Sequence, residues 1–125
     1  MLSKSENEVM ELLWNTNIPL TASEIVNQSP KKTWKTSYVH LLLNSLLKKE
    51  MIKVAGIKQT TKNFARTFEA AVTKEEYMII EMKKQEAMSP RALPYLISTL
   101  IQDTSDPELI KELEEMIQKR KDELK

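Results

Sequence analysis

The stretch "SYVHLLLNSLLKKE", residues 37–50, places apolar side chains at the spacing of one helical stripe. They recur at i, i+3, i+4, i+7 and i+8, the pattern of a helix that packs one face against a core. These positions are Val39, Leu42, Leu43, Leu46 and Leu47. The opposite face carries mostly short, neutral, hydrogen-bonding groups around a leucine: Ser37, His40, Leu41, Asn44, Ser45 and Lys48. A face of this composition is suited to contact with another molecule.

Two capping-box patterns precede this helix. Ser3 with Glu6, and Thr21 with Glu24, have the S/T-x-x-E spacing in which hydroxyl and carboxylate satisfy the free amides of a first helical turn. They predict helices over about 4–15 and 22–28.

A hairpin is predicted after the third helix. Residues 51–57 and 63–70 are rich in β-branched and aromatic side chains and flank the polar stretch "KQTTK". Three helices followed by a hairpin is the element order of a winged helix-turn-helix, whose third helix enters the DNA major groove.

The C-terminal part is predicted to be wholly helical. Capping-box spacing at Thr73 and Ser105, and a proline after Ser89, predict helices over 74–88, from about 89 onward, and over 106–124. Their apolar stripes are too extensive to be buried against the small N-terminal domain. This favours pairing with a second copy of the chain. The residues expected at that interface are Tyr77, Ile80, Leu93, Leu96, Ile97, Leu100, Ile101, Leu109, Leu113, Met116 and Ile117.

The sequence therefore predicts a mainly α fold with a small β-hairpin. Residues 1–71 are expected to form the winged-helix DNA-binding domain and residues 72–125 a helical dimerisation region. The opening segment lacks the features of a signal peptide, and the apolar run at 93–101 is too short to cross a membrane. A cytoplasmic location without membrane contact is the expectation.

Charge is distributed unevenly behind a net value of +1. Residues 31–66 contain nine basic side chains and one acidic one, whereas residues 72–125 contain nine basic and twelve acidic ones. A local cationic excess of this size indicates a polyanionic partner.

Catalytic chemistry has few candidates in this sequence. It contains one histidine, one glycine and no cysteine, which excludes Cys-His pairs, thiolate metal sites and Gly-rich phosphate loops. No enzyme, metal or cofactor is expected, and double-stranded DNA is the expected partner.

The DNA hypothesis assigns roles to residues. Base contacts are expected from the neutral face, in which asparagine suits adenine, histidine can donate to guanine and leucine can touch a thymine methyl. These residues are Ser37, His40, Leu41 and Asn44. Contacts to the DNA backbone, which add affinity without sequence preference, are expected from Lys35, Thr36, Tyr38, Lys48, Lys58, Lys62 and Arg66.

Alternatives remain open at this stage. His40 can be an ordinary surface histidine, Leu41 can pack on a neighbouring helix, and the lysines can form a solvated face. Trp14 and Trp34 fit core or edge packing better than base stacking. A winged helix can also serve as a protein-interaction module without sequence-specific DNA binding.

Four stretches resemble the penicillinase and methicillin-resistance repressors (BlaI/MecI type). "ENEVMELLW" (6–14) and "WKTSYVHLLLNSLLKKEMI" (34–52) carry most of the resemblance, and "TASEIV" (21–26) and "ARTFEAAVTKEEY" (65–77) extend it. It implies a homodimeric repressor that binds dyad operators built around TACA/TGTA. It also implies, as in several family members, an inducing sensor-controlled protease that cuts the dimerisation helices.

The sequence departs from the family pattern at informative positions. Ser45 stands where the family usually has arginine, and Glu50 where it usually has glycine, a residue that relieves a positive-φ helix cap. The Asn-Phe bond cut in the antibiotic-responsive members aligns near Thr99-Leu100.

Overall fold

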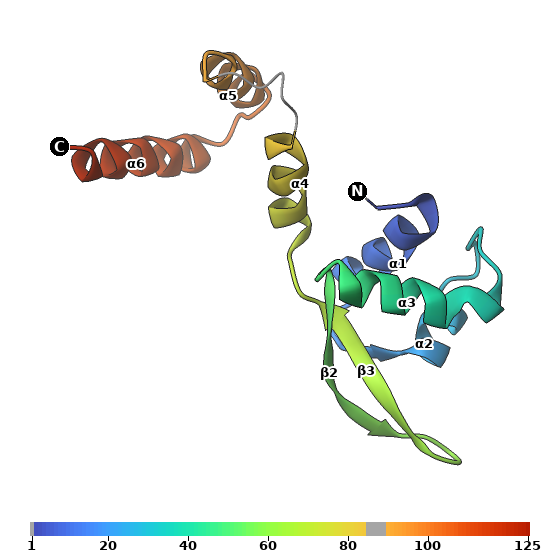
Figure 1. The fold of residues 1–125 in the computed structure, drawn as a ribbon. Coiled ribbons are helices and arrows are strands. Elements are labelled where there is room, and N and C mark those ends of the chain that lie inside the picture. The colour runs from blue at the N-terminus through green and yellow to red at the C-terminus, as the bar shows by residue number, and fades with distance from the viewer. Residues whose placement is uncertain (1, 85–89) are drawn as a thin grey trace. The chain divides into compact units, whose positions relative to one another are not determined.

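The computed structural model describes residues 2–84 and 90–125. They fall into two compact units, the described residues up to 82 and those from 83 onward (Figure 1). The chain is mainly helical with one small antiparallel sheet, as the sequence predicts.

The first two helices begin at capping boxes. Helix α1 spans Lys4–Asn15 and α2 spans Ala22–Asn27. In each box the N-cap hydroxyl accepts from the backbone amide of the glutamate, and the glutamate carboxylate accepts from the N-cap amide. The predicted starts of both helices are confirmed.

The third helix starts as a tight turn. The 3-10 turn η1, Thr36–Tyr38, leads into α3, Val39–Lys48. The Glu50 amide donates to the Leu47 carbonyl and the Met51 amide to the Leu46 carbonyl, both at 3.0 Å. This is a Schellman motif, and it places Glu50 at φ 61°, in the region that favours glycine.

The sheet has three strands where the sequence predicts two. The predicted hairpin is β2, Ile52–Gln59, with β3, Phe64–Ala70, and the short β1, Leu20–Thr21, pairs with the other edge of β3. Strand β1 went unpredicted because two residues carry no alternation pattern. The β2–β3 register shifts between Val54 and Gly56, which accounts for the imperfect alternation of "MIKVAGI".

The core of the first unit lies between α1, α2, α3 and the sheet. The stripe of α3 contributes three buried residues, and its Leu42 and Leu47 are half-buried at the edge. Trp34 is buried and Trp14 is half-buried, donating through Nε1 to the Val72 carbonyl at 2.9 Å. The buried apolar side chains are Val9, Met10, Leu13, Leu20, Ile25, Trp34, Val39, Leu43, Leu46, Met51, Ile52 and Phe68.

Helix α4 spans Lys74–Lys83 and begins at the predicted box of Thr73 and Glu76. The last part of the predicted helix 74–88 lies outside the described residues. Tyr77 packs at the edge of the first unit's core, its ring centroid 5.8 Å from that of Trp14.

The last two helices begin differently from the prediction. Helix α5 spans Ala92–Gln102 with Arg91 as N-cap, so Pro90 is not its first residue, and Ser89 lies outside the described residues. Helix α6 spans Pro107–Glu123. Its N-cap is Asp106, which accepts from the Glu108 amide, and not Ser105, because Asp106 directly precedes the proline at the first helical position. Within the described ranges, no helix is long and apolar enough to span a membrane.

Candidate nucleic-acid interface

The outer face of α3, defined as Ser37 of the preceding turn with His40, Leu41 and Asn44, is exposed. Leu41 is 65% accessible, so it does not pack on a neighbouring helix of the described chain. The four predicted base-contacting residues therefore lie on one open surface, which is opposite the buried stripe of the same helix.

Several predicted backbone contacts flank this face. Thr36 and Tyr38 are exposed in the turn that opens α3, and Tyr38 is 46% accessible. Lys35 lies just before that turn and Lys48 at the end of α3. Among the described residues, neither lysine has a carboxylate within ion-pair distance, so both ammonium groups are available to phosphates.

The hairpin lysines and arginine differ in their surroundings. Lys62 is exposed in the β2–β3 turn, and the Arg66 guanidinium lies 5.3 Å from the ring centroid of Phe68. Lys58 instead forms an ion pair of 2.7 Å with Glu24 on α2. The hydrogen bond from Lys58, with that from the Thr21 amide, lowers the pKa of Glu24. Contact of Lys58 with a phosphate must therefore compete with this carboxylate.

Helix α2 adds two polar residues that were not predicted from the sequence. Ser23 and Asn27 are exposed, and they line a hollow of about 430 Å³ between α2 and the start of α3, beside Ser37 and His40. Their i, i+4 spacing places them on one helix face. That spacing of two short polar residues on the outside of helix 22–28 is the signal that could have found them.

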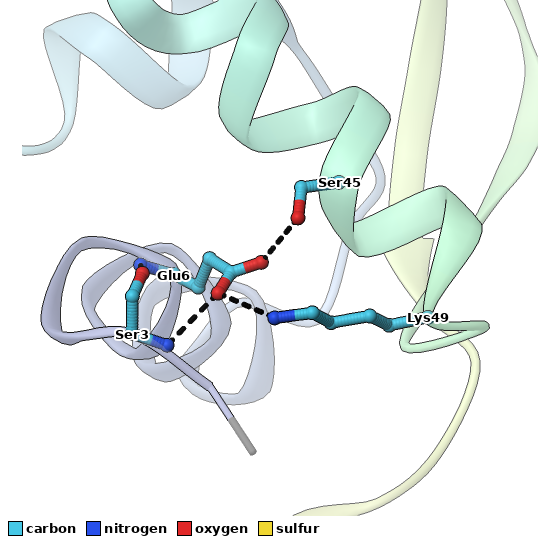
Figure 2. A network of polar contacts seen from close by, with 4 residues as sticks. All are labelled: Ser3, Glu6, Ser45 and Lys49. Carbon is cyan, nitrogen blue, oxygen red and sulfur yellow. Dashed lines mark hydrogen bonds and ion pairs between the residues drawn. The ribbon is translucent and has the colours of Figure 1, made fainter.

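A buried carboxylate joins α1 to α3, as Figure 2 shows. Glu6 is 4% accessible, and its carboxylate accepts from the Ser45 hydroxyl at 2.7 Å, the Lys49 ammonium at 2.8 Å and the Ser3 amide at 2.8 Å. The helical stripe of residues 37–50 predicts Ser45 on the outward face of α3, and this prediction was wrong. The residue is half-buried and turns toward α1, because Glu6 needs hydrogen bonds at that position.

The hydrogen bonds around Glu6 determine the ionisation of its carboxyl group. Burial by itself raises the pKa of Glu6, but the hydrogen bonds from Lys49, Ser3 and Ser45 outweigh it and lower the pKa from 4.5 to about 2. Glu6 is therefore charged at neutral pH. It holds the C-terminal half of α3 against α1 through Ser45, a residue of α3, and Lys49, the C-cap of α3.

The residues expected at a dimer interface are largely uncovered. No described residue of α4, α5 or α6 is buried. Leu100 is 69% and Met116 63% accessible, values typical of side chains without a partner surface. Ile80, Leu93, Leu109 and Ile117 are also exposed, and the half-buried members are Tyr77, Leu96, Ile97, Ile101 and Leu113.

Comparison with known proteins identifies the family. The family model described as penicillinase repressor matches residues 2–119, nearly the whole chain. The chain belongs to the penicillinase repressor family. The family is one of DNA-binding transcriptional regulators and not of enzymes, and this repressor has the winged-helix fold.

Solved structures give weaker likenesses to the repressor. The Helicobacter pylori ferric uptake regulator Fur shares 19% identity at a TM-score of 0.44, over 69% of this chain and 73% of that one. The Streptococcus pyogenes adhesin competence repressor AdcR shares 15% identity at a TM-score of 0.43, over 98% and 80%. Similarities of this size carry no inference about the repressor. No curated protein sequence matches the chain.

Proposed function

We propose that the repressor is a homodimer that silences genes by binding a palindromic operator of the TACA/TGTA type. In this proposal residues 1–71 bind the DNA and residues 72–125 hold the two copies together. The observation that carries it is the outer face of α3, four exposed side chains with no lysine, arginine or carboxylate among them, beside a strongly cationic hairpin.

The chemistry of that surface separates two kinds of contact. The outer face of α3 has the short donors, acceptors and methyl groups that read base edges in the major groove. Lys35, Lys48 and Lys62 carry no base information and supply the phosphate contacts. Two such surfaces in one symmetric dimer would bind two half-sites whose centres are one or more DNA turns apart, at about 34–36 Å for each turn.

The uncovered helices support the dimer. Exposed leucine and isoleucine side chains on α5 and α6 lose contact with water when two copies pair, at roughly 25 cal/mol per Å² of apolar surface. A closed two-fold interface is the usual way for identical chains to bury the same apolar face.

Induction is proposed to act on the helical region through a protease or sensor. The Thr99-Leu100 bond lies inside α5, where the Thr99 hydroxyl donates to the Tyr95 carbonyl at 2.9 Å. A protease needs extended backbone, so cleavage at this bond would require α5 to unwind locally first.

Fluorescence anisotropy across a salt series tests the proposal. The full-length chain is titrated onto a labelled TACA/TGTA dyad duplex and onto a scrambled duplex. Tight dyad-dependent binding that weakens steeply with salt supports a repressor that reads DNA. The competing function, a protein-interaction module, predicts no preference for the dyad and little effect of salt on its partner binding.

A further inference from the structure

The wing, defined as the β2–β3 hairpin, exposes two large apolar side chains. Ile57 and Phe64 are each 71% accessible. The register pairs Ile57 with Arg66 and Gln59 with Phe64. Side chains opposite one another project from the same face of a sheet, so these four residues share one face and Ile57 and Phe64 are diagonal neighbours on it.

The rest of the fold covers little of these two side chains. Strand β1 covers the other edge of β3 only at Thr67 and Phe68, so the distal wing is a bare two-stranded ribbon. Figure 1 shows this part of the hairpin projecting beyond α2 and α3. On the same face, Phe68 enters the core, whereas Phe64 four residues earlier remains in water. Folding alone therefore does not explain two apolar residues at this place.

Charge decides which partner fits the wing. The segment 53–66 contains four basic side chains and no acidic one. A second copy of the wing would be repelled by this charge, whereas DNA is attracted by it. The DNA minor groove combines phosphate rims with apolar base-stack edges, and proteins that bind it commonly insert phenylalanine or isoleucine between base steps.

The geometry points to a second DNA-reading element: Phe64 and Ile57 enter the minor groove beside the site bound by α3 and partly unstack a base step. Arg66 lies opposite Ile57 on the same face, with its guanidinium beside the Phe68 ring. The negative potential of a narrow A·T groove attracts a guanidinium at this position. Because flexible steps such as TA open most easily, the wing makes the repressor prefer TA-rich flanks that α3 does not touch. This inference rests on the proposed DNA binding.

The test uses the full-length repressor and two duplexes that share the TACA/TGTA dyad. One has TA-rich flanks with 2-aminopurine in the flanking step, and the other has G·C flanks. The wild type should bind the TA-flanked duplex more tightly and raise the 2-aminopurine fluorescence. Phe64→Ala should lose about tenfold in affinity for the TA-flanked duplex, lose the flank preference and abolish the fluorescence rise.

Two further variants control for charge and folding. Lys62→Ala removes a neighbouring cation, so it should weaken binding to both duplexes alike and keep the fluorescence rise. Phe64→Leu keeps an apolar side chain and should retain most of the flank preference. Thermal unfolding of Phe64→Ala should match the wild type, since this side chain is exposed.

Three results would overturn the inference. If the wild type binds the dyad without a fluorescence rise or flank preference, the wing does not read DNA, although the proposed function stands. If Phe64→Ala leaves DNA binding unchanged but alters self-association in sedimentation, the wing is a protein contact. If the wild type binds neither duplex, the proposed function and the wing inference fail together.

Discussion

The Ser45 hydroxyl on α3 lies 2.7 Å from the Glu6 carboxylate on α1. This hydrogen bond, with the 2.8 Å contact from Lys49, couples the helix proposed to read DNA to the first helix of the fold. Because the carboxylate is buried, removing its partners would leave a charge with little compensation. The orientation of α3 thus depends on a group that has no place in the proposed DNA contact.

Acid should weaken the fold through Glu6. Its pKa of about 2 in the folded chain lies below the unfolded value of 4.5. A lowered pKa stabilises the fold at pH above 4.5, and that stabilisation is lost as pH falls from about 4.5 toward 2. This difference between the folded and unfolded pKa values corresponds to about 3 kcal/mol of unfolding free energy. Urea unfolding at fixed protein concentration, from pH 7 down to pH 3, measures the loss.

Glu6→Gln provides the control for the acid prediction. The variant should be less stable than the wild type at pH 7. The difference in stability should narrow at pH 3, because the Glu6 carboxyl of the unfolded wild type is protonated below pH 4.5 and folding must then release that proton. A gap that stays constant with pH would show that Glu6 does not carry the acid sensitivity.

Glu50→Gly should stabilise the repressor by about 1 kcal/mol. Glu50 has φ 61°, the only positive φ among the described residues, and glycine adopts this conformation without steric cost. Thermal unfolding measures the gain. Glu50→Ala removes the same charge but keeps a Cβ, so it should show no comparable gain. Equal stabilisation by both variants would assign the effect to charge.

Glu24→Gln should strengthen DNA binding by releasing Lys58. Glutamine can keep the capping box of α2 but forms no ion pair with the ammonium 2.7 Å away. The slope of log K against log salt should become steeper by about 0.9, the value for one added phosphate contact. Glu69→Gln releases Lys53, for which no phosphate contact is predicted, and should leave the slope unchanged. An unchanged slope in Glu24→Gln would mean that Lys58 does not contact DNA.

Leu100→Asp should break the proposed dimer. Its side chain is 69% accessible on α5, and a carboxylate buried there without a partner would oppose pairing. In sedimentation the wild type should have twice the chain mass of 14.5 kDa, and the variant the mass of one chain. Ser98→Asp puts the same charge at an exposed position of α5 and should remain dimeric. A monomeric wild type would refute the dimer itself.

Local patterns in the sequence were sufficient to predict most of the helices and the hairpin. Three capping boxes located helix starts because their hydrogen bonds lie within four residues of each other. The stripe of α3 predicted its burial because helical geometry alone fixes that face. At Ser105 the pattern misled, since the neighbouring Asp106 offers a competing cap directly before a proline.

Features that depend on contacts distant in sequence were not predictable. Glu6 reads as a cap residue, and nothing local shows that Ser45 and Lys49, about forty residues later, turn toward it. Strand β1 exists only because β3 pairs with it. The pairing of Lys58 with Glu24 likewise joins residues from separate elements, so a lysine predicted as available is already paired.

The comparison of His40→Ala with Lys62→Ala tests most directly whether the outer face of α3 reads bases. Anisotropy titrations measure the affinity of each variant for the dyad duplex and for random DNA of equal length. His40→Ala should weaken dyad binding more than random binding by about 1–3 kcal/mol, because a base contact is lost. Lys62→Ala should weaken both about equally, because a phosphate contact carries no sequence information. If His40→Ala also weakens both equally, the outer face of α3 does not discriminate sequence and the proposed mode of operator recognition is wrong.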